Sequence, residues 1–267
     1  GGRTLDLRIG DEAHARGIPV AAYLANGNYR GTRWCRDVDL ILTDSYATAK
    51  MYKEQDGIDV TPIGPFIDPT HVIAEERDPQ NVLLVNPSLA KGAAIVIRLA
   101  MMLEKERPDI TFEVVQSRGN WEALVRQVTK QFGDERSELS NVIVTPNTSD
   151  MRPIYGRAKV LLALSLWWES FGRVATEATM NGVYVIATNR GGLPEATGEN
   201  ASLIDLPESC YKPPYNQIPG PEIFHAIRNS LETAFDNPEP PGENKTYRDI
   251  INHSNDRLQH ALDLIRQ

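Results

Sequence analysis

The chain has 267 residues, of which 41% are hydrophobic and 24% are charged, a composition typical of a globular protein. Its formal net charge of −8 disfavours nucleic-acid binding and argues against a basic, membrane-facing surface. The two cysteines, Cys35 and Cys210, stand apart without metal-ligand spacing, and the longest apolar runs are too short to span a membrane. We therefore expect a reduced, cytoplasmic protein that holds any anionic ligand through local positive groups.

The first 68 residues predict a small unit in which helices alternate with short strands. Ser45 is a good N-cap residue and Gly57 a good helix terminator. In chain order we expect a helix around 11–16, strands at 18–24 and 39–44, a helix from Ser45 to about Gln55, and a short strand near 60–64. Residues 65–79 are rich in proline and charge, which is typical of a linker between domains.

From residue 81 onward, short apolar runs alternate regularly with amphipathic segments. This alternation predicts a parallel sheet with helices on both faces. The expected strands are 82–85, 111–115, 141–145, 160–166, 183–187 and 201–204. The expected helices are 91–103, 121–132, 150–158, 170–182, 222–235 and about 246–266.

The segment that follows the apolar run 160–166 has the pattern of a phosphate-binding turn. Ser170 is a candidate N-cap and Gly182 a candidate C-terminal residue for the helix between them. In open α/β sheets, ligands bind beyond the carboxyl ends of the strands, where helix N-termini offer free N–H groups to phosphates. We therefore expect the amides of Phe171 and Gly172 to hold a diphosphate, because glycine allows a ligand to approach the backbone closely.

Two carboxylates lie on either side of this helix start. Glu169 precedes the expected cap, and Glu177 lies about 10 Å further along at about 1.5 Å per residue. Carboxylates accept hydrogen bonds from paired hydroxyl groups, so the order of hydroxyl pair, diphosphate and hydroxyl pair predicts a nucleotide sugar. The spacing alone equally allows two surface acids that merely stabilise a helix N-terminus.

The segment from Glu169 to Glu177, followed by 181–195 with its Gly-Gly-Leu-Pro-Glu sequence, resembles the signature of retaining glycosyltransferases of the GT-B fold. These are the group 1 type, with a Glu-x7-Glu motif, Phe-Gly between the two acids and a downstream Gly-Gly-x-x-Glu. The resemblance implies that Glu169 is catalytic and contacts the donor sugar, and that Glu177 binds the ribose. It also implies that Ser170, Phe171, Gly172 and Arg173 bind the donor diphosphate.

The same resemblance implies an α/β, GT-B-like fold with a complete C-terminal Rossmann-like parallel-sheet domain and a partial N-terminal Rossmann-like domain. Residues 1–68 would form the partial, acceptor-side domain, which lacks its first part, and 69–80 the linker. Residues 81–240 would bind the nucleotide sugar, and 241–267 would form a helix that packs back on the N-terminal part. Relatives often have a histidine after the strand that ends near residue 24, where this chain has Ala25.

A second motif, Asn86-Pro-Ser-Leu-Ala-Lys91-Gly92, is similar to the strand-end Lys-Gly loop of these enzymes, whose lysine contacts the diphosphate. The resemblance makes Lys91 a catalytic residue, because an ammonium group stabilises a departing diphosphate. Many relatives place an arginine shortly before this lysine. Here Asn86 is expected to bind the diphosphate instead, and Arg173 or Arg190 to supply the positive charge. By itself, a lysine at a helix start such as Lys91 is more often a solvated surface residue than a functional one.

The resemblance also places the nucleobase near Asn147, Thr148 and Met151, at the end of the expected strand 141–145. Trp167 and Trp168 could stack on a ring, although bulky aromatic residues beside a sheet more often belong to a core or an interface. The chain has no dinucleotide-binding glycine motif, no Walker loop, no nucleophile elbow and no zinc-type cluster. We therefore expect no metal site and no cofactor.

These inferences predict metal-independent transfer of a sugar from a nucleoside-diphosphate sugar to the hydroxyl group of a sugar or glycan acceptor, with retention of configuration. Such an enzyme would serve polysaccharide or glycoconjugate biosynthesis and would meet a membrane only through its acceptor. A partner chain could complete the N-terminal domain. The alternative is a nucleotide-sugar-binding module or subunit that is inactive on its own. An epimerase or phosphorylase fits less well, since the phosphorylases are much longer and carry pyridoxal phosphate on a lysine.

Overall fold

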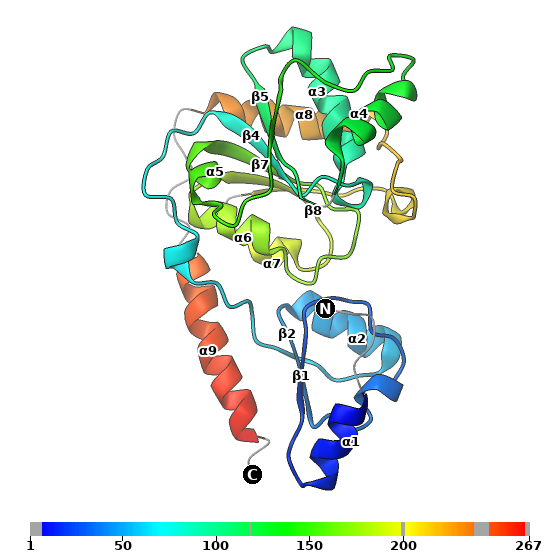
Figure 1. Cartoon of the computed structure of the whole chain (residues 1–267), viewed down its shortest axis with the longest axis vertical. Helices are drawn as coiled ribbons and strands as arrows, with labels where there is room; N and C mark the ends of the chain where they lie inside the picture. Colours follow the sequence, from blue (N-terminus) through cyan, green and yellow to red (C-terminus); the bar gives the residue numbers. More distant parts are fainter. Residues whose placement is uncertain (1–6, 118, 199–200, 238–245, 265–267) are drawn as a thin grey trace.

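The computed structural model describes residues 7–117, 119–198, 201–237 and 246–264, which form two lobes joined by an extended segment (Figure 1). In the described residues, each lobe is built on a parallel sheet. The smaller sheet has three strands in the order β1-β2-β3, and the larger has six in the order β6-β5-β4-β7-β8-β9. The chain is thus an α/β protein with a GT-B-like pair of Rossmann-like units, as predicted.

The smaller lobe follows the predicted order of elements. Its elements are α1 (Leu7–Ala15), β1 (Ala21–Leu24), the 3-10 helix η1 (Arg33–Cys35), β2 (Leu40–Thr43), α2 (Tyr46–Asp56) and β3 (Thr61–Pro62). The Ser45 side chain accepts a hydrogen bond from Thr48 N at 3.0 Å, and Gly57 ends the helix at a φ of 70°. Both end signals of α2 were therefore predicted correctly from the sequence. A 3-10 helix, η2 (Pro69–His71), lies in the segment that leads to the larger lobe.

The larger lobe alternates strands and helices. Its first half contains β4 (Asn81–Val85), η3 (Leu89–Lys91), α3 (Ala93–Glu106), β5 (Thr111–Val115), α4 (Trp121–Lys130), β6 (Val142–Thr145) and α5 (Arg152–Arg157). Its second half contains β7 (Ala158–Ala163), α6 (Arg173–Met180), β8 (Tyr184–Thr188), α7 (Leu193–Thr197), β9 (Ala201–Ile204), η4 (Glu208–Tyr211) and α8 (Pro221–Asp236). The short helix α7 was not predicted.

Two boundaries near the expected site differ from the prediction. The strand β7 ends at Ala163 rather than at residue 166, and α6 begins at Arg173 rather than after a cap at Ser170. The residues between them, 164–172, form an irregular segment that we call the exit loop. It stays buried for much of its length, which explains why its composition imitates a continuous strand.

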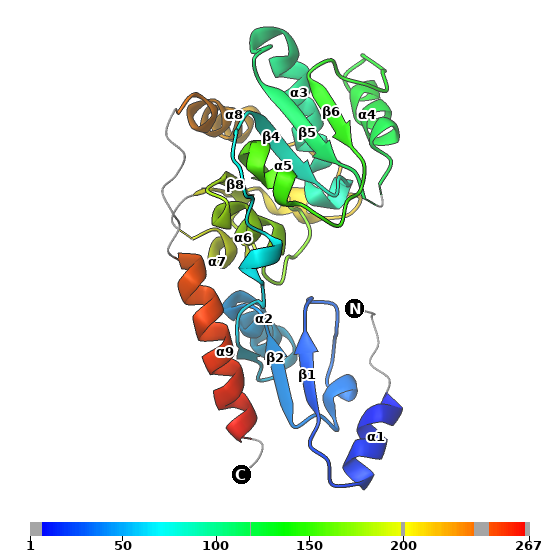
Figure 2. The same cartoon turned by 60° about the vertical axis from the view of Figure 1, so that its left-hand side comes forward.

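Alternation of side chains along the strands buries both faces of the larger sheet. Val82 and Leu84 pack on the face covered by α3, α4 and α8, whereas Leu83 packs on the face covered by α5, α6 and α7 (Figure 2). The strand order reverses between β4 and β7, which are neighbours in the sheet although three helices separate them in the chain. In open α/β sheets, ligands bind at such a switch point, beyond the carboxyl ends of the strands.

The helix α9 (Thr246–Leu264) follows α8 and lies beside the smaller lobe (Figures 1 and 2). Ala261 is buried in a cluster with Leu42 and Ile63, which come from the small sheet and its exit. The Arg257 guanidinium lies 5.3 Å from the centre of the Tyr46 ring. The last helix thus bridges back from the larger lobe. Among the described residues, no helix is both long enough and apolar enough to cross a bilayer.

A buried carboxylate lies in the larger sheet on β5, next to the edge strand β6. Glu113 of β5 is only 1% exposed, and it accepts hydrogen bonds from Arg157 Nε at 2.8 Å, Thr145 Oγ1 at 2.6 Å and Asn81 Nδ2 at 3.1 Å. Burial alone would raise the pKa of Glu113, but the hydrogen bonds from Arg157 and Thr145 outweigh it and hold that pKa below its usual value. Arg157 thus compensates a charge that would otherwise be costly inside the fold.

Replacing Arg157 by methionine is expected to lower the free energy of unfolding by about 3 kcal/mol, because the Glu113 carboxylate would stay buried without its cation. The control is Arg152→Met on the same helix, whose exposed pair with Asp150 should contribute less than about 1 kcal/mol. Urea denaturation measures both. Because the pKa of Glu113 is lowered, the stabilising contribution in the wild type should exist above the usual pKa and disappear as the pH falls through the lowered value. Equal losses in the two variants would contradict this account.

Candidate active site

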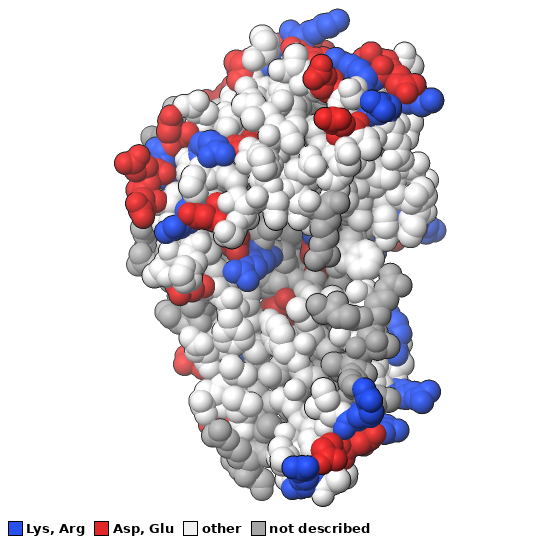
Figure 3. All heavy atoms as spheres, in the orientation of Figure 1, with Lys and Arg blue, Asp and Glu red and all other residues white. Residues whose placement is uncertain are grey.

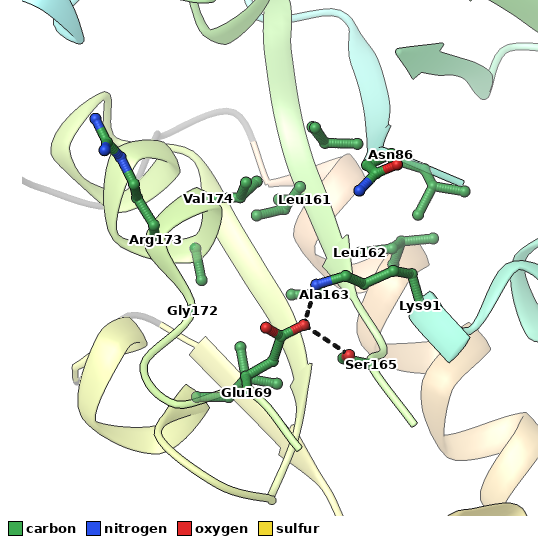
Figure 4. A pocket seen from close by; sticks show the side chains of 14 residues that line it. Asn86, Lys91, Leu161, Leu162, Ala163, Ser165, Glu169, Gly172, Arg173 and Val174 are labelled. Atoms are coloured by element: carbon green, nitrogen blue, oxygen red, sulfur yellow. Dashed lines mark hydrogen bonds and ion pairs between the residues drawn. The ribbon is translucent and has the colours of Figure 1, made fainter. Parts of the chain in front are cut away.

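A cavity of about 190 Å³ lies at the carboxyl ends of β4 and β7, at the switch point of the larger sheet (Figure 4). We call it the strand-end cavity. Its floor is formed by apolar residues of the two strands, and its polar wall by Asn86, Lys91, Ser165 and Glu169. Arg173 also lines it, but its guanidinium points away from Lys91 and bonds to Glu177 (Figure 4). The cavity therefore combines an apolar base with a few polar groups, which is the usual composition of a small-molecule site.

Lys91 and Glu169 form an ion pair inside the strand-end cavity (Figure 4). Their side chains are 34% and 18% exposed, so solvent screens the pair only in part. Glu169 Oε1 also accepts a hydrogen bond from Ser165 Oγ at 2.8 Å. The structure thus brings together two residues that are 78 positions apart in the chain, and both had been predicted as catalytic.

The position of Lys91 depends on a close backbone contact at Gly92. Gly92 has a φ of 77°, and a Cβ atom built on it would lie 2.1 Å from the carbonyl oxygen of Leu164. Nearby, Ala90 O accepts hydrogen bonds from the amides of Leu166 at 2.8 Å and Trp167 at 3.0 Å. The turn that carries Lys91 therefore packs directly on the backbone of the exit loop, and only glycine fits at the contact.

The Gly-Gly pair at 191–192 holds the exit loop from the other side. Cβ atoms added at Gly191 and Gly192 would lie 2.4 Å from Glu169 O and 2.3 Å from Ser170 O. The amide of Gly192 donates a hydrogen bond to Glu169 O at 2.9 Å. The motif that the sequence offered only as a resemblance thus has a structural role, because it fixes the backbone of the residue that carries the Glu169 carboxylate.

The residues expected to bind a diphosphate are only partly brought together. Gly172 and Arg173 line the strand-end cavity, and Gly172, with a φ of 114°, is the N-cap residue of α6. The prediction that Ser170 caps this helix is wrong, because α6 begins at Arg173, after Gly172. Its hydroxyl group donates to Ala25 O at 2.9 Å in the smaller lobe. The Phe171 side chain is 4% exposed and belongs to the core.

Glu177 lies one helical turn into α6 and does not line the strand-end cavity. It is buried, and it accepts hydrogen bonds from Tyr155 Oη at 2.7 Å and Arg173 Nε at 2.6 Å. Burial and the nearby Glu177 charge raise the pKa of Tyr155. The sequence did not point to Tyr155, since nothing links it to Glu177 before the two helices pack. The predicted ribose contact of Glu177 stays a prediction.

Of the remaining predicted residues, some line the strand-end cavity and others do not. Asn86 lines it and has a φ of 56°, which lets the chain turn sharply after β4. Asn147, Thr148 and Met151 do not line it; the Thr148 hydroxyl accepts a hydrogen bond from Asp150 N at 3.1 Å within its own turn. Arg190, considered as a substitute cation for the diphosphate, lines a different cavity.

The exit loop also joins the two lobes, and Figure 3 shows a hollow between them with charged side chains at its edge. Ser170 Oγ contacts Asp44 Oδ2 at 3.0 Å, and Thr48 Oγ1 donates to Ser170 O at 3.1 Å. On the same side, the Glu195 carboxylate accepts hydrogen bonds from the amides of Tyr46 at 2.9 Å and Ala47 at 2.8 Å. Glu195, the final residue of the Gly-Gly-x-x-Glu motif, thus binds the N-terminus of α2, a role that the sequence did not reveal.

Asp44 is the buried acid of this junction. Burial raises the pKa of Asp44, while the hydrogen bond from Ser170 opposes the shift without cancelling it. Ser170 has one hydroxyl proton but two acceptors within reach, Ala25 O and Asp44 Oδ2. A protonated Asp44 would satisfy both acceptors, because it would donate to Ser170 while Ser170 donates to Ala25 O.

Comparison with known families decides the membership of the chain. The model of the family described as glycosyl transferases group 1 matches residues 71–208, which is more than half of the chain. The chain belongs to the glycosyl transferases group 1 family. The matched region contains both Lys91 and Glu169, so the ion pair of the strand-end cavity lies within the family domain.

Individual relatives agree with this membership. The D-inositol 3-phosphate glycosyltransferase of Pseudarthrobacter chlorophenolicus is 30% identical over 122 residues, which cover 43% of this chain and 28% of that relative. The pneumococcal O-GlcNAc transferase GtfA, solved with UDP and GlcNAc, superposes with a TM-score of 0.67 at 14% identity, over 97% of this chain and 54% of its own.

Two further solved structures share the fold. The GtfA/B complex superposes with a TM-score of 0.64 at 14% identity over 96% of this chain and 54% of that chain. HepE of Anabaena, solved with UDP-glucose, superposes with a TM-score of 0.62 at 18% identity, over 94% of this chain and 70% of the HepE chain. The chain thus spans little more than half of the GtfA chain and of the matched chain in the GtfA/B complex, and under a third of the curated relative. These likenesses establish the GT-B fold.

Substitution of Gly92 by alanine tests the close contact that positions Lys91. Gly133→Ala is the matched control, because Gly133 has a φ of 73°, close to the 77° of Gly92, but no atom within 4 Å of an added Cβ. The control should lose about 1–2 kcal/mol of unfolding free energy from backbone strain alone. Gly92→Ala should lose about 1–3 kcal/mol more from overpacking. Urea titration measures both, and equal losses would show that the contact with Leu164 is not tight.

Substitution of Asp44 by asparagine tests the buried acid of the junction. The raised pKa means that ionised Asp44 lowers the stability of the fold, and this cost fades as the pH falls through the raised value. Asp44→Asn should therefore raise the unfolding free energy near neutral pH. The gain should shrink as the pH falls through the raised pKa and disappear below the ordinary pKa of an aspartate. Asp59→Asn, at a side chain 86% exposed, is the control. A gain that does not change with pH would contradict the assignment.

Proposed function

We propose that this chain transfers a sugar from a nucleoside-diphosphate sugar to an acceptor hydroxyl group, with retention of configuration and without a metal. The observation that carries the proposal is the Lys91–Glu169 pair at the switch point of the larger sheet, inside the matched family domain. The pair offers a cation for a diphosphate and an acceptor for sugar hydroxyl groups in one small cavity.

In this proposal the donor diphosphate binds at the start of α6. Gly172 and the first residues of α6 line the strand-end cavity, so the positive end of the helix dipole lies at its edge, and Lys91 lines the same cavity. As the bond from the anomeric carbon to the diphosphate oxygen breaks, the electron pair leaves with the diphosphate. Lys91 stabilises the charge that develops on that oxygen.

Glu169 orients the donor sugar in this scheme. When the diphosphate takes Lys91 as its counter-ion, the Glu169 carboxylate is released to accept hydrogen bonds from sugar hydroxyl groups. Ser165 Oγ, at 2.8 Å, keeps the carboxylate in place during the exchange. The acceptor oxygen forms its bond to the anomeric carbon on the face that the diphosphate leaves, and its proton passes to a diphosphate oxygen. Attack on that face gives retention.

The proposed ribose and diphosphate contacts of Glu177 and Arg173 require one local change. In the structure these two residues pair with each other, and the Arg173 side chain is 66% exposed. Because the Glu177 side chain is buried, its carboxylate loses a cation when Arg173 turns toward the diphosphate, and hydrogen bonds from the ribose hydroxyl groups must replace that contact. Glu177 would then have a free oxygen for the ribose hydroxyl groups while Tyr155 holds the other, and the base would extend toward Met151.

Partners and location follow from the same proposal. We expect a nucleotide sugar as donor, a sugar or glycan as acceptor, and a cytoplasmic enzyme that meets a membrane only through its acceptor. A partner chain that completes the smaller lobe is supported by the fold likeness to a chain of the GtfA/B complex. The second candidate function, a module that binds the donor without transferring the sugar, is favoured by the small sheet, in which three strands are described.

A panel of nucleotide sugars tests the proposal. Thermal stabilisation and calorimetry with UDP, GDP and ADP sugars should identify one base that binds, and Lys91→Met should weaken its binding at least ~10-fold, or about 1.4 kcal/mol. The control is Lys50→Met, at an exposed lysine on α2 that is paired with Glu54. Binding that is insensitive to Lys91→Met would overturn the site.

Product analysis separates the two candidate functions. NMR of the released or transferred sugar should show the anomeric configuration of the donor, and a chelator should leave the rate unchanged. If the donor binds but is neither hydrolysed nor transferred, even with a partner chain present, the module is the correct function. An inverted product would contradict the retaining step.

A further inference from the structure

A second cavity, of about 290 Å³, lies on the other side of the exit loop from the strand-end cavity. We call it the aromatic cavity. Its walls come from the loop 27–30 after β1, residues 166–168 of the exit loop, Arg190, and the two tyrosines Tyr211 and Tyr215. Both lobes therefore contribute to it. Its volume lies near the lower end for small-molecule pockets, about 300 Å³, which suits one or two sugar rings.

Four aromatic side chains line this cavity, namely Trp167, Trp168, Tyr211 and Tyr215. All four are only partly buried, so ring surface stays accessible. A pyranose ring has one apolar face of C–H groups and a polar rim of hydroxyl groups. Such a ring stacks on an indole or phenol ring while its rim bonds to neighbouring polar groups, and Trp and Tyr offer both an apolar body and a polar end.

Two arginines line the same cavity from opposite lobes. The Arg190 guanidinium lies 3.9 Å from the centre of the Tyr211 ring and 5.8 Å from that of Trp168. Within the described part of the chain its one ion pair is with Glu208, whose side chain is 80% exposed and lies 3.4 Å away. Arg190 Nε is buried and has no hydrogen-bond partner among the described residues. A buried donor without a partner is unfavourable, and an anionic ligand oxygen would satisfy it.

Arg30 lies on the opposite wall of the aromatic cavity. It pairs with Asp56 at 2.9 Å, and its side chain is 49% exposed. Each guanidinium carries five N–H donors, so both arginines keep donors for a ligand after their present contacts. Because the chain has a net charge of −8, an anion at this place needs such local cations.

The exit loop connects the two cavities directly. Ser165 and Glu169 face the strand-end cavity, and the three residues between them face the aromatic cavity. A ligand stacked on Trp168 would therefore contact the residue that directly precedes Glu169, whose carboxylate we assign to the donor sugar. Only an acceptor needs such a position, since the donor occupies the other side of the loop.

We propose that the aromatic cavity is the acceptor subsite, and that it binds a saccharide with an anionic group, a carboxylate or a phosphate. The sugar ring stacks on the aromatic side chains, and the anion pairs with Arg190 and Arg30. This inference rests on the proposed glycosyl transfer, for which it specifies the acceptor class. It also assigns ring stacking to Trp167 and Trp168, for which the sequence had favoured a core or interface position.

Binding of three simple sugars to the full chain tests the inference. The probes are methyl β-glucuronide, glucose 6-phosphate and the neutral methyl β-glucoside, measured by saturation-transfer NMR and titration in the presence of the donor nucleotide. The two anionic sugars should bind at least ~10-fold more tightly than the neutral one. Comparison of the carboxylate with the phosphate identifies which anion the cavity prefers.

Matched variants assign the binding to the cavity. Arg190→Gln should remove the advantage of the anionic sugars, and Arg190→Lys should restore part of it. Trp167→Ala should weaken the binding of all three sugars. The control is Arg98→Gln, because the Arg98 guanidinium also lies on an aromatic ring, 4.3 Å from the centre of Phe132, but at a distance from this cavity in the fold. Circular dichroism confirms that each variant is folded.

Two sets of outcomes keep the inference separate from the proposed function. Equal binding of neutral and anionic sugars, or anionic binding that is unchanged in both Arg190 variants, would overturn the anionic acceptor. If the nucleotide binds and none of the sugars does, the acceptor subsite is wrong and the donor site stands. If the sugars bind and no nucleotide does, the proposed transfer fails and the cavity is a sugar-binding site alone.

Discussion

The site depends on close backbone packing around the exit loop. Gly92 presses the Lys91 turn against Leu164, and Gly191 and Gly192 hold the backbone of Glu169 from the opposite side. Because no Cβ atom fits at these contacts, the loop has little freedom to shift. Two charges from distant parts of the chain are thereby held together beyond the ends of β4 and β7.

The same loop sets the relation between the lobes. Ser170 reaches into the smaller lobe, and Glu195, three residues after Gly192, binds the first amides of α2. The Trp168 indole donates a hydrogen bond to Thr48 at 3.3 Å. The loop thus carries donor-facing groups at Ser165 and Glu169, aromatic groups between them, and the contacts that join the lobes. Residues that line either cavity are therefore within a few positions of residues that contact the smaller lobe.

The fold was largely predictable from the sequence because parallel strands buried on both faces and helix end signals such as Ser45 and Gly57 are local features. The motif residues Lys91 and Glu169 were predicted as one site and do meet. The exit loop was misread, since its buried residues imitate a strand and Ser170 imitates a cap. The contacts of Tyr155 and Glu195 and the aromatic cavity could not be predicted. Their residues come from segments that only tertiary packing brings together.

The most direct test of the central claim is a crystal structure of the chain with the nucleoside diphosphate that stabilises it. The account predicts the diphosphate beyond the ends of β4 and β7, at the start of α6, with a phosphate oxygen at hydrogen-bonding distance from Lys91 Nζ, about 2.7–3.2 Å. The Lys91–Glu169 pair should be broken in that complex. A diphosphate bound instead between Arg30 and Arg190, with Lys91 still paired to Glu169, would contradict it.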